Sequence, residues 1–154
     1  MANTIGVEFL TKKVQLSDLP PIKAQIWDTS GSERYRSITT GHYRQAVGAV
    51  LVFDITDRAS FDQVDFWLQQ LRDNSNDNVV ICLMANKADL ADQRQVSSED
   101  IELLVARERL IYVGECSALS DTNIKQSFEL LIRKVHEMQE QHKQAVIASS
   151  MKLN

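Results

Sequence analysis

No part of this sequence is apolar over the roughly 20 residues that a membrane-spanning helix needs. Residues 1–4 lead directly into a strand-like segment, without the charged and apolar regions of a secretion signal. Together these two absences predict a soluble, cytoplasmic chain.

The sequence is also poor in cysteine and has no excess of basic residues. Cys82 and Cys116 each lie in an apolar strand pattern, with no His or Cys at metal-ligand spacing, so we expect buried free thiols. Lys and Arg number 17 against 21 Asp and Glu, which gives a formal net charge of -4. Because nucleic-acid binding needs a basic face that neutralises phosphates, this balance predicts no nucleic-acid partner.

What is present is the composition of an ordinary globular domain, with 44% hydrophobic and 25% charged residues. A chain of 154 residues can bury one core of its own but is too short for two domains of usual size. We therefore predict one domain over residues 1–144. Residues 145–154 are predicted to be a short tail that frays or continues the preceding helix.

Strand and helix patterns alternate along the chain, which predicts an α/β fold with a parallel sheet and right-handed crossovers. Residues 6–16 and 22–27 flank a turn that contains Pro20 and Pro21, so we expect an antiparallel hairpin there. The later elements expected are strands at 47–54, 79–85 and 110–113, a helix with Ser60 as its cap, a helix capped near Ser97, and a helix over 122–144.

Three short motifs follow predicted strands. Asp28 ends the second strand of the hairpin and Gly31 comes three residues later, at the sheet edge where open α/β folds bind phosphates or metals. Asn86-Lys87-Ala88-Asp89 follows the strand at 79–85, and Ser117-Ala118 follows the strand at 110–113. In this order and spacing the three motifs resemble those of small GTPases.

The resemblance extends over residues 4–142 and is to the Rab branch of the Ras-like small GTPases. It is carried by Thr4-Ile5-Gly6-Val7-Glu8-Phe9, by the residues from Trp27 to Ser37, and by Asn86-Lys87-Ala88-Asp89-Leu90. Leu71-Arg72-Asp73 and the segment from Ser117 to Asn123 resemble the recycling-endosome subgroup of Rabs.

This resemblance implies the three-layer P-loop small-GTPase (Ras-like) fold, a mostly parallel sheet with one antiparallel edge hairpin. It also implies a guanine-nucleotide-dependent switch in vesicle-mediated membrane traffic, with GTP or GDP and Mg²⁺ as cofactors. Rab effectors and regulators are the partners that it implies.

The resemblance implies a guanine-binding set in two loops, formed by Asn86, Lys87, Asp89, Ser117, Ala118 and Leu119. Asp89 would accept two hydrogen bonds from guanine, which adenine cannot donate. Lys87 would lay its aliphatic stem along the ring, and Asn86 would tie the loop to its surroundings. On the phosphate side, Thr4 and Asp28 would hold Mg²⁺, and the Gly31 N–H would reach the γ-phosphate.

One family motif does not occur in the sequence, the phosphate-binding run Gly-x-x-x-x-Gly-Lys-Ser/Thr. The resemblance places it, with a strand and a helix, upstream of Met1, so we expect a fold truncated at the N-terminus and weak nucleotide binding. The absent strand would lie between the strand that ends at Asp28 and the strand at 47–54. Either these two strands pair directly, or a second chain donates a strand.

Three further departures concern hydrolysis, partners and membranes. Ser32 stands where the family has the glutamine that orients the attacking water, so autonomous hydrolysis is expected to be weak or absent. His42 replaces a tyrosine of the aromatic triad that effectors read, which leaves an altered effector surface of Phe9, Trp27 and His42. The sequence ends without a cysteine for a prenyl anchor, so membrane association is expected only through partners.

Two functional interpretations follow. The chain is either a guanine-nucleotide switch, or a pseudo-GTPase that uses the Rab surface as a binding or scaffolding module without a GTP cycle. Without the family pattern, Phe9 and Trp27 would be interpreted as ordinary packing on a sheet face.

Overall fold

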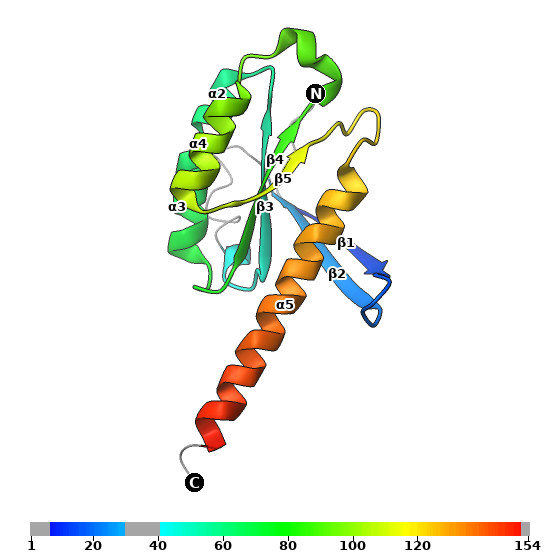
Figure 1. The fold of residues 1–154 in the computed structure, drawn as a ribbon, viewed down its shortest axis with the longest axis vertical. Helices are drawn as coiled ribbons and strands as arrows, with labels where there is room; N and C mark the ends of the chain where they lie inside the picture. The colour runs from blue at the N-terminus through cyan, green and yellow to red at the C-terminus, as the bar shows by residue number, and fades with distance from the viewer. Residues whose placement is uncertain (1–6, 30–40, 152–154) are drawn as a thin grey trace. The chain divides into compact units, whose positions relative to one another are not determined.

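The computed structural model describes residues 7–29 and 41–151 (Figure 1). The chain divides into two compact units. One unit comprises Met1–Ala46 and Phe66–Asp77, and the other comprises Val47–Asp65 and Asn78–Asn154.

An antiparallel hairpin dominates the first unit. Strands β1 (Val7–Val14) and β2 (Ile22–Thr29) pair from Val7 opposite Thr29 to Val14 opposite Ile22. In the turn, Gln15 Nε2 donates to the carbonyl oxygens of Leu16 and Leu19, each at 3.0 Å. The predicted hairpin is confirmed, and its second strand continues past the predicted end at Trp27 to Thr29.

The predicted helix that follows the third strand is in fact two helices, α2 (Arg58–Asp62) and α3 (Val64–Asn74). The prediction of Ser60 as its cap is wrong, because Asp57 caps α2 by accepting from two backbone N–H groups of its first turn. The Ser60 hydroxyl is used instead by the strand end: Oγ accepts from the Asp54 N–H at 3.0 Å.

The second unit contains a parallel sheet with strand order β3-β4-β5. Its strands are β3 (Gly48–Asp54), β4 (Val80–Asn86) and β5 (Ile111–Glu115). The predicted parallel sheet is therefore confirmed. The strands in the described part of the chain form two sheets, the hairpin of β1 and β2 in the first unit and the parallel sheet in the second.

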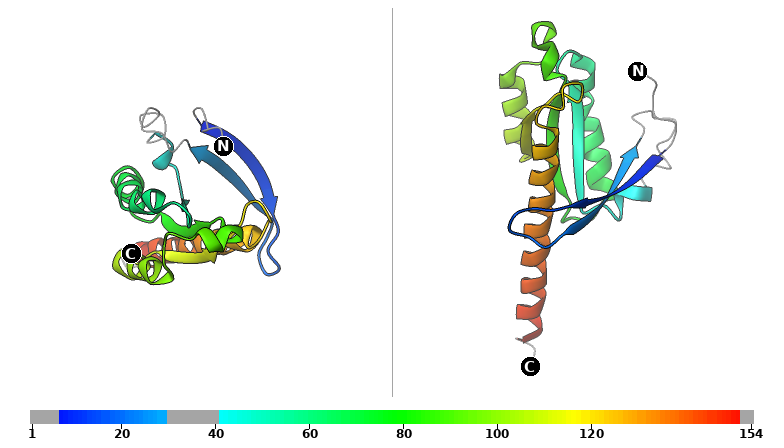
Figure 2. Two further views of the ribbon diagram at one scale, coloured as in Figure 1. Left: turned by 90° about the horizontal axis from the view of Figure 1, so that it is seen from above. Right: turned by 90° about the vertical axis from the view of Figure 1, so that its right-hand side faces the viewer.

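Helix α5 (Ile124–Met151) lies along the parallel sheet and contacts β3, β4 and β5 (Figures 1 and 2). The buried side chains at this contact are Val80, Cys82 and Leu131, with Val50, Ile111, Val113 and Val135 packed around them. Gly48 permits the close approach, because a Cβ there would lie 2.8 Å from Val135 Cγ2. On the opposite side of β3, Phe53 packs edge-to-face on Phe61 of α2, with ring centroids 5.0 Å apart.

Helix α4 (Ser98–Glu108) starts and ends at defined caps, and helix α5 is longer than predicted. Ser97 caps α4 by accepting from the Asp100 N–H at 3.1 Å, as predicted, and Arg109 ends it with a φ of 54°. The helix α5 continues beyond the predicted end at residue 144. No helix within residues 7–29 and 41–151 has the length and apolar character required to cross a membrane.

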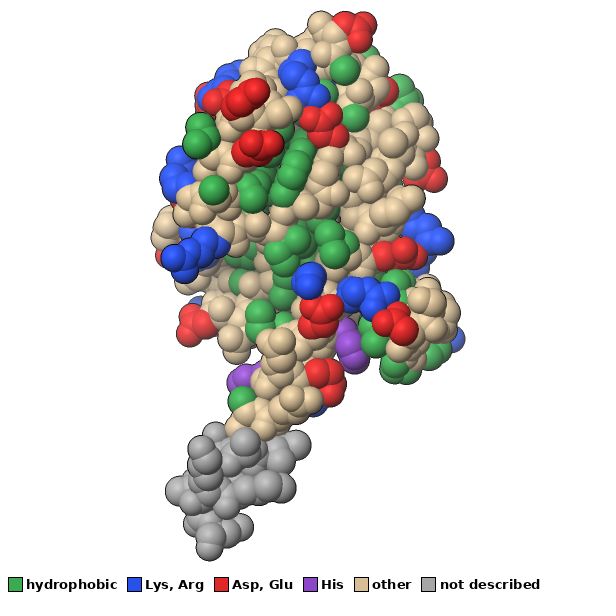
Figure 3. Space-filling view, viewed as in Figure 1, with side chains coloured by type: hydrophobic (Ala, Val, Ile, Leu, Met, Phe, Trp, Pro, Cys, Tyr) green, Lys and Arg blue, Asp and Glu red, His purple; other side chains and the backbone are tan. Residues whose placement is uncertain are grey.

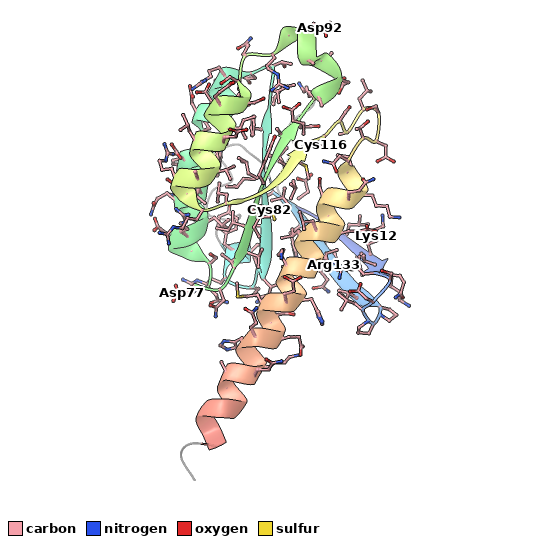
Figure 4. The ribbon with its side chains drawn as sticks, viewed as in Figure 1. Lys12, Asp77, Cys82, Asp92, Cys116 and Arg133 are labelled. Atoms are coloured by element: carbon pink, nitrogen blue, oxygen red, sulfur yellow. The ribbon has the colours of Figure 1, made fainter. Side chains whose placement is uncertain are left out.

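Both cysteines are buried and free, which confirms the prediction (Figure 4). Burial raises the pKa of the Cys82 thiol to about 11. On the face seen in Figure 3, acidic and basic side chains are interspersed.

Candidate functional site

The candidate site is formed by two loops at the carboxyl ends of β4 and β5. One loop runs from Asn86 into the short 3₁₀ helix η2 (Ala88–Gln93), and the other joins Cys116 to Asn123. Because β4 and β5 are parallel neighbours, their loops leave the sheet at the same edge. Figure 4 labels Asp92 in η2 and Cys116 just after β5.

Backbone and side-chain hydrogen bonds join the two loops. The Ala88 N–H donates to the Cys116 carbonyl at 2.9 Å. Asn86 Oδ1 accepts from the Ala118 N–H at 3.1 Å, and Ser117 Oγ donates to Asp89 Oδ1. The two motifs that the sequence separates by about 30 residues therefore form one cross-linked structure.

The β5 loop has its own internal clamp. Ser117 and Thr122 exchange two backbone hydrogen bonds of 3.0 Å. Asn123 adopts a φ of 57°, and its Nδ2 donates to the carbonyl oxygens of Val113 at 3.1 Å and Glu115 at 3.0 Å. A non-glycine residue in the left-handed region is uncommon and Asn tolerates it better than most, so Asn123 suits this position.

Lys87 is held at both ends. Its backbone has a φ of 67°, and its carbonyl accepts from the Leu90 N–H at 2.9 Å. Its Nζ lies 2.5 Å from Asp54 Oδ2, while Asp54 Oδ1 accepts from the backbone N–H and the hydroxyl of Thr56 at 2.8 and 2.7 Å.

The Asp54 carboxylate and the Lys87 ammonium each stabilise the charged form of the other. Burial alone would raise the pKa of the Asp54 carboxyl, but hydrogen bonds from Lys87 and Thr56 outweigh it and hold that pKa below its usual value. The hydrogen bond to Asp54 in turn raises the pKa of Lys87. Both groups are therefore charged near neutral pH.

The guanine-binding residues that the sequence predicts are thus brought together by the structure. Ser117 is buried at 1% exposure, whereas Asp89, Ala118 and Leu119 are exposed beside it. The exposed Asp89 carboxylate can accept hydrogen bonds from the N–H donors that line one edge of guanine. The acceptor that it presents fits that base.

The phosphate and metal residues are less fully described. Thr4, Gly31 and Ser32 lie outside the described residues. Asp28 is exposed near the end of β2, opposite Glu8 in the hairpin register.

The three residues of the expected effector surface form one aromatic stack in the first unit. The rings of Phe9 and Trp27 have centroids 4.7 Å apart, and the His42 ring stacks on Trp27 at 4.5 Å with an interplanar angle of 27°. Phe9 and Trp27 are 50% and 46% exposed, which is unusual for large aromatic side chains.

Sequence reasoning missed two residues of this region. The sequence identifies Asp54 only as the end of a strand, although an acid at the carboxyl end of a strand is also the feature that selects Asp28. Asn123 appeared only as part of the subgroup pattern. A conformation with positive φ is not visible in a residue pattern, so its clamping role could not be predicted.

Comparison with known proteins agrees with this geometry. The Ras family model matches residues 1–137. Ras-related protein YPTC6 of Chlamydomonas reinhardtii is 47% identical over 134 residues, which are 87% of this chain and 61% of that protein. Ras-related protein Rab11B of Nicotiana tabacum is 45% identical over 136 residues, 88% of this chain and 62% of that protein.

GTP-binding protein ypt3 of Schizosaccharomyces pombe is 46% identical over 133 residues, 86% of this chain and 61% of that protein. The chain therefore spans about three fifths of the length of these curated relatives. The extent of these matches shows that the chain belongs to the Ras family of small GTPases and is Rab-like.

Proposed function

We propose that this chain is a guanine-nucleotide-dependent switch in vesicle-mediated membrane traffic, of the recycling-endosome type among Rabs. The observation that carries the proposal is the pair of cross-linked loops after β4 and β5, which we call the base site. In it, Ser117 hydrogen-bonds to Asp89 and Asn86 hydrogen-bonds to Ala118. A preorganised carboxylate of this kind selects guanine, because the base donates two hydrogen bonds from one edge.

The proposal includes weak nucleotide binding by residues 1–154 as they stand. Their sequence contains no phosphate-binding Gly-x-x-x-x-Gly-Lys-Ser/Thr run. Loss of three charge-assisted hydrogen bonds, at about 1.5 to 3 kcal/mol each, lowers affinity by roughly three to six powers of ten. Thr4 and Asp28 are the proposed Mg²⁺ residues, and Gly31 is the proposed γ-phosphate contact. Ser32 in the glutamine position makes hydrolysis slow.

A change in base preference from guanine to xanthine tests the proposal. Asn in place of Asp89 offers an amide donor where the carboxylate accepts, so Asp89→Asn is expected to weaken GDP binding and to favour xanthosine diphosphate, which has an oxygen in place of the 2-amino group. Fluorescent GDP with Mg²⁺ and competition by the xanthine analogue measure both affinities.

Asp92→Asn is the matched control, because Asp92 is an exposed acid in the same 3₁₀ helix. It should leave both affinities unchanged. No GDP binding at millimolar concentration would reject the switch, and an unchanged base preference in Asp89→Asn would reject the assigned base site.

A second candidate function is a pseudo-GTPase, a binding module without a GTP cycle. The stack of Phe9, Trp27 and His42 favours it, because Phe9 and Trp27 are half exposed and exposed aromatic side chains are typical anchors of protein interfaces. This module would bind a Rab effector equally with and without nucleotide, whereas the switch would bind it in one nucleotide state.

The parallel sheet supports the proposal of a strand-donating partner. Val47 accepts from Val80 and Ile55 donates to Asn86, so alternate residues of β3 face β4. The N–H and C=O groups of Gly48, Val50 and Val52 therefore point to the other edge, where no described strand pairs with β3. A strand from a second chain would pair with these groups.

The remaining parts of the proposal concern organisation and location. Residues 1–144 form the GTPase domain and residues 145–154 the tail. The chain acts in the cytoplasm and reaches membranes through its partners.

A further inference from the structure

Asp54 lies at the end of β3 and is held in place by its own surroundings. Its N–H bonds to Ser60 Oγ at 3.0 Å, its carbonyl accepts from the Asp57 N–H at 3.1 Å, and its Oδ1 accepts two hydrogen bonds from Thr56. Only Oδ2 reaches across to the neighbouring loop, where it meets Lys87 Nζ at 2.5 Å.

The register of the sheet explains why this contact crosses between strands. Asp54 pairs with Asn86 in the parallel ladder of β3 and β4, so the next residue along β4, Lys87, leaves the sheet beside Asp54. The left-handed backbone of Lys87 changes the chain direction at that point, and the Ala88 N–H is bonded to Cys116 in the β5 loop. The backbone and the ammonium group of Lys87 are thus fixed independently.

A lysine fixed at both ends has a stem that can no longer sample its many rotamers. Lysine side chains carry large rotamer entropy, and ordering such a side chain on binding costs affinity. In this structure the Lys87 ammonium already has its partner, since Nζ lies 2.5 Å from Oδ2 of an Asp54 side chain that is only 19% exposed.

We propose that Asp54 is a positioning residue of the base site, which anchors the Lys87 ammonium so that the aliphatic stem forms a preset wall for the purine ring. This inference rests on the proposed function, because the ring it serves is that of the guanine nucleotide. Asp54 itself does not contact the base in this proposal and acts only through Lys87.

The test uses Asp54→Asn in the full 154-residue chain. Asn keeps an oxygen that can accept from Thr56 but removes the charge that holds Lys87. Immobilising one flexible side chain costs about 0.5 to 1.5 kcal/mol on binding, so affinity for GDP is expected to fall about two- to twelvefold. Because the effect is on the ring, affinity for guanosine without phosphates should fall by the same factor.

A second measurement needs no nucleotide. Acetylation of individual lysines by a limiting amine reagent, read by mass spectrometry, reports how strongly each ammonium is held. Lys87 should react more slowly than Lys125, whose side chain is 82% exposed. In Asp54→Asn, Lys87 should react faster than it does in the unaltered chain, and Asp54→Glu should restore part of the protection.

Asp62→Asn is the matched control. It removes the same charge as Asp54→Asn, but Asp62 pairs with Arg58 on the exposed side of α2. It should alter neither the reactivity of Lys87 nor the affinity for guanine.

Two results would overturn the role of Asp54: unchanged Lys87 reactivity in Asp54→Asn, or increased reactivity with no loss of GDP and guanosine affinity. Absence of nucleotide binding by the unaltered chain would instead refute the proposed function, and the labelling rates alone would still decide whether Asp54 holds Lys87.

Discussion

Asn123 stabilises the loop between Cys116 and Asn123 in two ways that different substitutions can separate. Its Nδ2 donates to the carbonyls of Val113 and Glu115 at 3.1 and 3.0 Å, and its backbone is in the left-handed region at φ 57°. Asn123→Ala removes the amide and also puts a less tolerant residue at positive φ. Asn123→Gly removes the amide alone and relaxes the backbone.

The magnitudes follow from these two terms. Two hydrogen bonds at about 0.5 to 1.5 kcal/mol each make the loss in Asn123→Gly about 1 to 3 kcal/mol, less the entropic cost of glycine in the unfolded chain. A left-handed non-glycine backbone adds about 1 to 2 kcal/mol, so Asn123→Ala should cost about 2 to 5 kcal/mol. A domain of ordinary stability, about 5 to 15 kcal/mol, would still fold.

Urea denaturation followed by circular dichroism measures both variants. With a slope of about 1 to 3 kcal/mol per molar urea, the midpoint of Asn123→Ala should fall by about 0.7 to 5 M, and that of Asn123→Gly by less. The same variants should lose guanine affinity, because the loop that carries Ser117 is no longer clamped. Equal midpoints for the two variants would refute the backbone argument, and a wild-type midpoint in both would refute the clamp.

Three further outcomes are expected. Gly48→Ala should destabilise the chain by about 1 to 3 kcal/mol, because the added Cβ would overlap a methyl of α5. Gly41→Ala should not, because the position has open space around it. Urea midpoints compare the two variants, and equal decreases in midpoint would contradict the packing argument. The thiols of Cys82 and Cys116, buried and with raised pKa values, should resist alkylation at pH 7.4 in the folded chain and react on unfolding; rapid alkylation without urea would contradict this. The pKa of the Asp54 carboxyl is lowered in the folded state, so the carboxylate contributes its full stabilisation above the usual pKa of an aspartate and loses it as the pH falls through the lower folded pKa. The difference in unfolding free energy between wild type and Asp54→Asn should therefore be constant above about pH 5 and shrink below about pH 4. A difference that grows on acidification would contradict this direction.

Much of the base site could be predicted from the sequence because it depends on order along the chain. Asn86 and Asp89 follow one buried strand and Ser117 follows the next, and parallel neighbouring strands bring such ends together. The hairpin was predictable for a similar reason, since two strand-like runs flank a turn rich in proline.

What could not be predicted depends on competition between near neighbours. Asp57 and Ser60 are both residue types that cap helices well, so the residue pattern alone does not show that Asp57 is the cap in place of the predicted Ser60. The structure decides between them because the Ser60 hydroxyl is bonded to the backbone of Asp54, which leaves Asp57 to cap α2. The role of Asp54 itself depends on strand register and on the left-handed turn at Lys87, and neither can be predicted from the spacing of residues.

The length of α5 has a consequence for how the molecule opens. At about 1.5 Å per residue its 28 residues extend about 42 Å, but its buried contacts with the sheet lie in its first half, at Leu131 and Val135. Residues 141–146 are exposed, and a helix of that length is not stable alone in water. Amide hydrogen exchange should therefore accelerate steadily from Leu131 toward the end of α5, so that the helix unwinds from its far end while the turns on the sheet stay closed.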